Sequence, residues 1–281
     1  MICVYNVEKH IRQCIEALLD QTIKDFEIII VDDGSTDNTR NIIEDFDGKR
    51  IRYFRNKKNV GIAKSRNKCI KLSRGEIVFF TDGDCIVSKN WIEQGLKFLK
   101  EKDCVGVEGR THYVAEDYKP SYSDHAIKNE KPGQFMTCNM AYKKSVIKSI
   151  GGFDERYTYH SDRDLALRAM KHGRIHFNPD MIVYHQKRTL KPMQLVKIGK
   201  RIRNRVLLYK RFRERKFILW RIVHPLNLMA ILFPPLILGI LLLSGYRTRK
   251  DFALFPFIYI RLIYERLNLW DMCARERVFL I

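Results

Sequence analysis

Short apolar runs rich in β-branched residues alternate with segments of helical periodicity through the first 185 residues. The run FEIIIV at residues 26–31 is too short for a helix, and it follows a helical pattern at residues 8–19. The same reading predicts strands at 51–54, 76–80, 104–108, 136–142 and 183–185, and helices around 42–46 and at 62–72, 91–99 and 161–172. This alternation is typical of an α/β fold with a parallel sheet, whose ligands bind outside the carboxyl ends of the strands.

The positive charge of the chain is concentrated in one stretch. The 281 residues carry a formal net charge of +20, and residues 186–222 supply +13 of it, whereas residues 1–185 supply +4. A nucleic-acid-binding protein is one explanation, but the sequence has no zinc-finger spacing, RNP-type aromatic run or basic zipper. We therefore predict no nucleic-acid partner, and expect residues 187–221 to form one or two basic amphipathic helices on anionic lipid.

A run without charged residues follows directly, from Ile222 to Tyr246. Pro234-Pro235 divides it into halves of about 17 Å, roughly half of a bilayer's hydrocarbon core. Arg247 follows, so a simple crossing would place positive charge on both sides. We expect residues 222–281 to form a re-entrant hairpin and interfacial helices. Two crossings, the second at 252–270, and a buried helical core or dimer interface are the alternatives.

The cysteines argue for a reducing compartment. Seven are scattered along the chain and none forms a CxxC pair, which disfavours both a disulfide framework and a zinc site. No secretory signal is recognised before the first motif, so we expect no export. The N-terminal part is therefore expected on the cytoplasmic side of the cell membrane, and a membrane-bound acceptor follows naturally.

Polar residues stand where two predicted strands end. FEIIIV leads into Asp32 and Asp33, whose carboxylates either hold ribose hydroxyls or a base edge or belong to a capped turn. The strand at 76–80 leads into Asp82, Gly83 and Asp84. Carboxylates at this spacing hold a divalent cation on a diphosphate, together with phosphate oxygens and water. An ordinary Asp-Gly turn is the alternative.

Neither of the glycine-rich phosphate-binding patterns, GxGxxG and GxxxxGK[ST], occurs in the sequence. Phosphate charge is therefore expected to be neutralised by a metal. Gly61 marks a loop-to-helix junction, and Lys64 and Arg66 follow in the first helical turns. These basic side chains either meet an anionic donor or form an exposed basic face.

Six motifs in order, taken together, resemble family 2 glycosyltransferases of the GT-A fold over residues 1–186. They are VYN at 4–6, VDDGSTD at 31–37, NVGIAKSRN at 59–67, TDGD at 81–84, GGFDE at 151–155 and DRDLALR at 162–168. The resemblance implies a Rossmann-like nucleotide-diphospho-sugar transferase domain at 1–186. The helical, membrane-associated region would follow this domain.

The resemblance also implies the roles of particular residues. Asp82 and Asp84 look like the family's DxD pair, with Asp82 toward the sugar or ribose and Asp84 on the metal. His185 matches a histidine that joins the metal or the pyrophosphate, although a histidine at a strand end is also typical of a structural or solvated residue. The metal, Mg²⁺ or Mn²⁺, would stabilise the leaving nucleoside diphosphate. The residues implied to bind the nucleotide sugar are Val4, Tyr5, Asn6, Asp32, Asp33, Gly61, Arg66, Asp82 and Gly83, and those implied at the metal are Asp84, Asp82 and His185.

Asp162 is the catalytic base that the resemblance implies, in the first turn of a helix. Its carboxylate would take the proton of an acceptor hydroxyl, and the reaction would invert the anomeric centre. The alternative is a capped helix start, with Ser161 as N-cap and Asp164 as its partner.

The chain departs from the family pattern at three places. Relatives often have Glu where Ser161 stands and Pro where Cys3 stands, and a glycine is missing near residues 137–140. Relatives also begin several residues earlier, so either the true start lies upstream of Met1 or the first strand, at 3–6, is trimmed.

We therefore expect an inverting, metal-dependent glycosyltransferase that moves a sugar from a nucleotide-sugar donor to a lipid-linked or polysaccharide acceptor at the membrane. A processive polysaccharide synthase is one alternative, although its QxxRW-type motif is missing after Asp162. A catalytically silent nucleotide-sugar-binding scaffold is the other.

Overall fold

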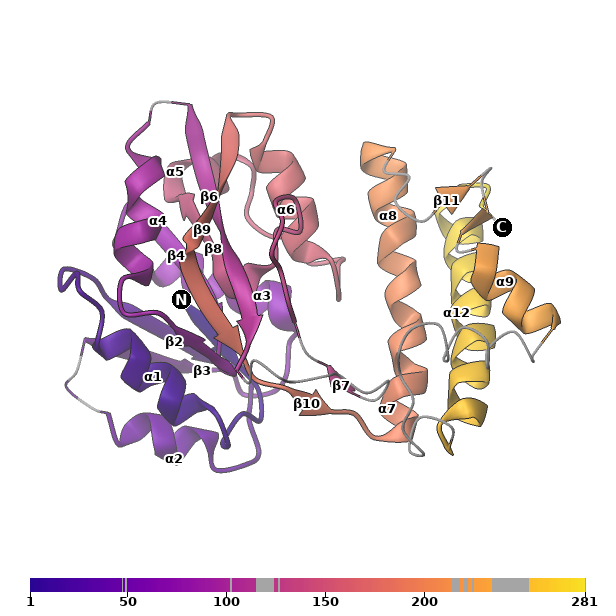
Figure 1. Cartoon of the computed structure of the whole chain (residues 1–281), viewed down its shortest axis with the longest axis horizontal. Helices are drawn as coiled ribbons and strands as arrows, with labels where there is room; N and C mark the ends of the chain where they lie inside the picture. The colour runs from indigo at the N-terminus through magenta and orange to yellow at the C-terminus, as the bar shows by residue number, and fades with distance from the viewer. Residues whose placement is uncertain are drawn as a thin grey trace. The chain divides into compact units, whose positions relative to one another are not determined.

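The computed structural model describes residues 1–46, 48, 50–101, 103–114, 124–125, 127–213, 218–219, 222–223, 225–233 and 253–280. The chain divides into two compact units (Figure 1). The first comprises residues 1–116 and 127–186, and the second comprises 117–126 and 187–281.

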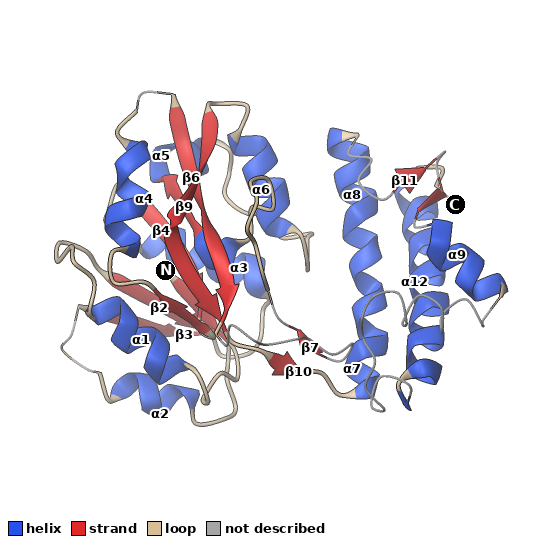
Figure 2. Cartoon of the chain, viewed as in Figure 1, coloured by secondary structure: helices blue, strands red, loops and turns tan. Residues whose placement is uncertain are grey.

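A mixed sheet with helices packed against it forms the first unit (Figure 2). The strand order is β3-β2-β1-β4-β8-β6-β9-β5. The strands are β1 (Ile2–Val4), β2 (Ile28–Asp32), β3 (Ile51–Arg55), β4 (Ile77–Asp82), β5 (Cys85–Val87), β6 (Cys104–Tyr113), β8 (Met140–Lys143) and β9 (Arg174–His185). The helices are α1 (Ile11–Leu19), α2 (Thr39–Glu44), α3 (Ile62–Leu72), α4 (Trp91–Leu99), α5 (Lys144–Ser149) and α6 (Ser161–Ala169), with a 3-10 turn η1 (Thr137–Asn139).

Local periodicity predicted most of these elements. In β2 every residue is buried, as expected of the apolar run before Asp32. In α1, Ile11, Cys14, Ile15 and Leu18 are buried at helical spacing. The predicted helices at 62–72 and 91–99 have the bounds of α3 and α4. These predictions are confirmed.

The expectation of a parallel sheet is wrong for part of the sheet. Strands β1 to β4 pair in parallel, but β8 runs antiparallel to both β4 and β6, and β5 runs antiparallel to β9. Periodicity cannot reveal strand direction, because a buried strand shows the same apolar run in either direction. The strand predicted at 136–142 also proves to be η1 followed by β8.

The second unit is mainly helical. Its elements are β7 (Asp124–His125), β10 (Arg188–Thr189), α7 (Pro192–Lys197), η2 (Ile198–Arg201), α8 (Ile202–Phe212), β11 (Ile218–Leu219), β12 (Ile222–Val223), α9 (Pro225–Leu232) and α12 (Phe255–Glu276). The apolar side of α8, with Ile202 and Val206, packs against Leu269 and Cys273 of α12. Part of the amphipathic pattern in the basic stretch is therefore explained by packing within this unit.

The predicted membrane segments are only partly described. Pro234, Pro235 and Arg247 lie outside the described residues, as does the rest of 234–252. Residues 255–270 of the predicted second crossing belong to α12, which buries Arg266 and Asn268. Within the described ranges, none of the helices combines the length with the apolar character that a membrane crossing requires.

Candidate functional site

The end of β2 places two buried carboxylates that bind neighbouring parts of the protein. Asp32 accepts hydrogen bonds from the Ser35 backbone N–H at 2.7 Å and from the Tyr53 hydroxyl at 2.8 Å. Burial, followed by the hydrogen bond to Asp32, raises the pKa of Tyr53, so the phenol remains a donor. Asp32 thus holds the turn that follows its own strand, and its direct contact with a nucleotide stays a prediction.

Asp33 fixes the start of α3. Its Oδ1 accepts from the Val60 N–H and from Asn56 Nδ2, both at 2.9 Å, and its Oδ2 accepts from the Gly61 N–H at 2.9 Å. Gly61 has φ 98°, a conformation that glycine adopts without the steric cost of a Cβ atom. The predicted Asp33 and Gly61 are therefore neighbours in space, although they are 28 positions apart in the sequence.

The first strand is shorter than predicted. β1 ends at Val4, which is buried. Tyr5, which is exposed, and Asn6, which has φ 54°, lie beyond it. The Asn6 N–H donates to Ser35 Oγ at 3.0 Å, and Asn6 Oδ1 accepts the Thr36 N–H at 2.8 Å. These bonds join the segments that follow β1 and β2, at the carboxyl ends of the two strands.

Arg66 of α3 reaches the end of β4. Its Nη2 lies 3.3 Å from Asp82 Oδ1, and its guanidinium lies over the Phe153 ring, with 5.5 Å from Cζ to the ring centroid. The Arg66 side chain is largely buried, whereas Asp82 is about one quarter exposed. The predicted pair therefore offers a fixed cation and a partly accessible carboxylate at the same strand end.

Gly83 is required by packing. A Cβ atom at this position would lie 2.9 Å from Val4 Cγ1 and 3.2 Å from Val7 Cγ2. The chain between Asp82 and Asp84 can therefore pass closely over the end of β1 only without a side chain.

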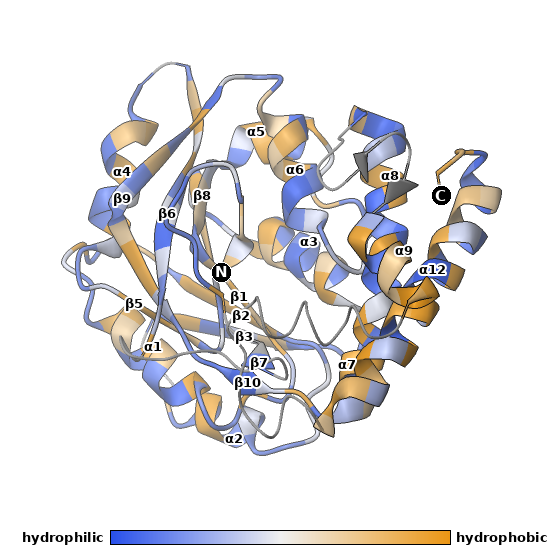
Figure 3. Cartoon of the chain, turned by 45° about the vertical axis from the view of Figure 1, so that its right-hand side comes forward, coloured by the Kyte–Doolittle hydropathy of each residue, from blue (hydrophilic) through white to orange (hydrophobic). Residues whose placement is uncertain are grey.

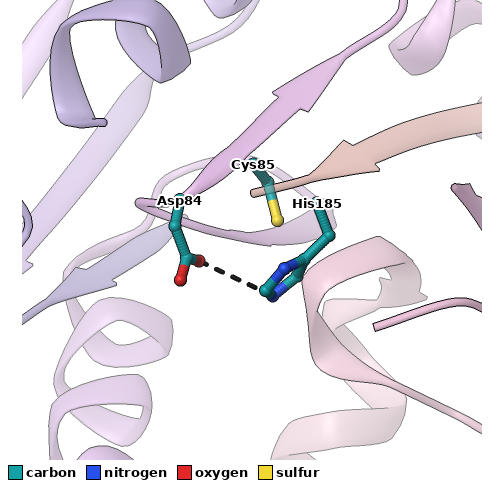
Figure 4. Close-up of side chains that lie close together, drawn as sticks. All are labelled: Asp84, Cys85 and His185. Atoms are coloured by element: carbon teal, nitrogen blue, oxygen red, sulfur yellow. Dashed lines mark ion pairs between the residues drawn. The ribbon is translucent and has the colours of Figure 1, made fainter. Parts of the chain in front are cut away.

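Asp84 and His185 come together beside Cys85 (Figure 4). His185 Nε2 lies 3.7 Å from Asp84 Oδ1, and one ligand atom from each of the three residues lies within 4.8 Å of the others. Oxygen and imidazole nitrogen on converging side chains fit a divalent cation such as Mn²⁺. Asp82 lies outside this group and pairs with Arg66, so its role as a ligand stays a prediction.

Asp162 lies in the first turn of α6, as predicted. Its Oδ1 accepts the N–H of Arg163 at 2.8 Å. The alternative of a Ser161 cap is wrong, because the helix already includes Ser161 and follows His160, which has φ 61°. Asp164 pairs instead with Arg168, at 2.8 Å to Nε.

Glu108 of β6 was missed by sequence reasoning. Its buried carboxylate accepts the backbone N–H groups of Gly133 at 2.7 Å, Gln134 at 2.9 Å and Phe135 at 2.6 Å. Arg163 donates to the carbonyl of Gly133 at 2.8 Å and so attaches the same loop to α6. A single acidic residue inside a predicted strand belongs to no recognisable motif. The role of Glu108 becomes visible only when the structure brings the loop at 133–135 next to it.

Tyr142 of β8 is buried. Burial raises the pKa of its hydroxyl well above the usual value, and the negative charges of Asp162 and Glu108 raise it further. The phenol therefore keeps its proton. Cys85, the other residue that we missed, did have a signal, because it directly follows Asp84.

A family model and several known proteins match this chain. A family model described as "Glycosyl transferase family 2" matches residues 1–153. The chain is 37% identical over 118 residues to glycosyltransferase GlyG of Streptococcus pneumoniae, covering 41% of this chain and 39% of that protein. It is 32% identical over 164 residues to the putative glycosyltransferase EpsH of Bacillus subtilis, covering 53% and 47%. The chain thus spans about half or less of these two relatives.

Solved structures share the fold. The Staphylococcus aureus protein TarS in complex with UDP matches with a TM-score of 0.59 at 20% identity, over 99% of this chain and 91% of that one. The mannosyltransferase PcManGT of Pyrobaculum calidifontis, in complex with GDP-Man and Mn²⁺, matches with a TM-score of 0.61 at 17% identity, over 96% and 86%. These likenesses show the GT-A fold.

Proposed function

The chain belongs to glycosyl transferase family 2, and we propose that it transfers a sugar from a nucleotide-sugar donor to an acceptor hydroxyl with inversion at the anomeric carbon. One observation carries the proposal. The end of β4 presents Asp82 and Asp84, which meet Arg66 from α3 and His185 from β9. A cationic side chain and a group of metal-binding atoms at one strand end suit a diphosphate.

The donor would lie along the ends of β1, β2 and β4. The joined turns at Asn6 and Ser35 would receive the nucleoside, and Arg66 would bind the phosphates. UDP and GDP-Man in the neighbouring structures support a nucleotide-sugar donor. Asp84 and His185, with Asp82, would hold Mg²⁺ or Mn²⁺, which when bound neutralises the charge that develops on the leaving diphosphate.

Asp162 would act as the general base. Its carboxylate would take the proton of the acceptor hydroxyl as that oxygen attacks the anomeric carbon, and the bond to the nucleoside diphosphate breaks on the opposite face. The turn of α6 that carries Asp162 is held through Arg163 to the loop on Glu108. This loop would keep the base in place while acceptors exchange.

The acceptor is proposed to be a lipid-linked saccharide or a polysaccharide at the cytoplasmic face of the cell membrane. Supporting features in the second unit are the exposed apolar residues Leu226 and Leu232 of α9 and Leu267 and Trp270 of α12. Figure 3 shows the apolar colour on both helices. Positive charge in the same unit lies on α7 and α8. Cationic residues together with exposed apolar residues suit binding at the interface of an anionic membrane.

Donor turnover tests the proposed reaction. UDP-, GDP- and dTDP-sugars are supplied to membrane extracts containing the full chain, with and without Mn²⁺. We expect metal-dependent transfer from one donor, reduced about 10²- to 10⁴-fold in Asp162→Asn. The control Asp180→Asn changes an exposed carboxylate of the same unit and should leave transfer unchanged. Donor binding without transfer would favour the silent scaffold, and repeated addition to one acceptor would favour a processive synthase.

Vesicle sedimentation tests the membrane proposal separately. The chain should sediment with vesicles that contain anionic lipid and much less with neutral ones, and salt should weaken this binding. Replacing both Leu232 and Leu267 by Ser should weaken binding at constant charge. Equal binding to neutral and anionic vesicles would contradict the electrostatic part of the proposal.

A further inference from the structure

We propose that Cys85 is a sulfur ligand of the cation site formed by Asp84 and His185, so that the site favours cations that accept sulfur, such as Co²⁺ and Zn²⁺, over Mg²⁺. The inference rests on the proposed function and deepens it, because it names the class of cation that the same site takes. It is supported by the pairing of the strands, by the backbone hydrogen bonds around His185 and by the chemistry of the ligand set.

The pairing of β5 with β9 places Cys85 directly opposite His185. Residues opposite each other on antiparallel strands project to the same face, with Cβ atoms about 4.5–5.5 Å apart. Figure 4 shows the Cys85 sulfur pointing toward the space between Asp84 and His185. The three ligand atoms lie within 4.8 Å of one another, so small side-chain rotations bring them to one ion.

The backbone orients His185 as a ligand. Its Nδ1 lies 2.7 Å from the carbonyl oxygen of Gln186, so we assign the proton to Nδ1, which donates to that carbonyl. Nε2 then faces Asp84 Oδ1, 3.7 Å away. A carboxylate oxygen and an imidazole nitrogen that face each other can bind one cation, and an Nδ1–H bond to a carbonyl is the usual support of a metal-bound histidine.

A second backbone bond fixes the other side of the group. The N–H of Gln186 donates to the carbonyl oxygen of Asp84 at 2.9 Å, so the residue after His185 is tied to the residue before Cys85. Both strand ends are therefore held in register where the three side chains converge. Such preorganisation lowers the conformational cost of binding an ion.

The chemistry of the ligand set determines the preference. Mg²⁺ demands oxygen ligands in near-octahedral geometry, whereas Co²⁺ and Zn²⁺ accept sulfur and nitrogen in smaller coordination shells. Cys85 is 1% exposed and His185 4% exposed, so bulk water has little access to either side chain. Asp84, Cys85 and His185 supply three ligands, and the remaining coordination positions would be open to water or a diphosphate oxygen.

Spectroscopy of metal-loaded full-length protein without donor tests the inference. X-ray absorption of the Zn²⁺-loaded wild type should show one sulfur at about 2.3 Å. Co²⁺ should give a sulfur-to-cobalt charge-transfer band that disappears in Cys85→Ser and in Cys85→Ala. We expect Co²⁺ affinity to fall on the order of tenfold or more in these variants, while Mg²⁺ affinity changes much less.

The matched control is Cys104→Ser, which changes another buried thiol of the same unit and should keep the band. Retained Mg²⁺ binding by the Cys85 variants would show that their site is still folded. A Zn²⁺ spectrum without sulfur, or a band of equal strength in both Cys85 variants, would overturn the inference. These measurements contain no donor, so their result does not depend on transfer activity. The sulfur ligand can therefore be confirmed or excluded independently of the proposed glycosyl transfer.

Discussion

Glu108 accepts the backbone N–H of Phe135 at 2.6 Å, although the two residues are 27 positions apart. The same carboxylate also binds the N–H groups of Gly133 and Gln134, and Asn129 donates to it from its side chain at 2.9 Å. One buried acidic residue in β6 therefore holds the loop that contacts Arg163 of α6. Through this loop, Glu108 links β6 to α6, the helix that carries the proposed base Asp162.

Replacing Glu108 by Gln should lower the free energy of unfolding by about 1–3 kcal/mol. The amide NH₂ would replace one carboxylate oxygen and face a backbone N–H, so a buried donor would lose its acceptor. Urea unfolding measures this change. The control Glu130→Gln alters an exposed residue paired with Lys128 and should leave the unfolding midpoint unchanged. Equal midpoints for the wild type and Glu108→Gln would contradict the role assigned to the loop.

Gly83→Ala should destabilise the first unit by about 1–3 kcal/mol, because the new methyl group would press on Val4 and Val7. Donor affinity should fall as well, since the chain between Asp82 and Asp84 must move. Gly75→Ala is the matched control, where the new Cβ would meet only the Ile77 carbonyl oxygen, at 3.5 Å. Thermal unfolding of both variants compares them, and equal losses would refute the packing argument.

Asparagine variants of Asp162 and Asp164 should differ in stability. Asp164 is buried and pairs with Arg168, so Asp164→Asn leaves a largely buried cation without its partner charge and should cost about 3–5 kcal/mol. Asp162→Asn removes one charge from the first turn of α6 and should cost less than about 1 kcal/mol. Urea unfolding measures both. A loss of stability in Asp162→Asn as large as in Asp164→Asn would assign Asp162 a mainly structural role.

The Cys14 thiol should stay unreactive in the folded protein. Burial, with the nearby charge of Asp84 as the next cause, raises its pKa from 9.0 to about 12. Iodoacetamide at pH 8 should therefore modify Cys14 only after unfolding, as mass spectrometry of digested protein will show.

The same shift makes stability depend on alkaline pH. The folded state keeps the Cys14 proton that the unfolded state releases, so this contribution is complete below pH 9 and is lost as the pH rises toward 12. Cys14→Ala should flatten the decline of the unfolding free energy between these values. An unchanged slope would show that other groups cause the decline.

The local sequence pattern was sufficient to predict most helices and strands of the first unit. The burial of β2 and of one face of α1 follows from residues that are neighbours in sequence, and the same reading located Asp33 and Asp84 just after strands. It misjudged the end of β1, and the alternative N-cap that it offered for α6, Ser161, is also wrong. Both depend on single backbone conformations, at Asn6 and His160, that no periodicity reports.

Side-chain periodicity and turn residues act over a few positions, so the sequence was enough to show which segments become helix or strand and which motifs stand at strand ends. Long-range pairing, in contrast, brings Cys85 opposite His185, 100 residues later, and Glu108 to the loop at Phe135. Strand direction and register are chosen by burial and hydrogen bonds between distant segments, so neither can be read from any one of them.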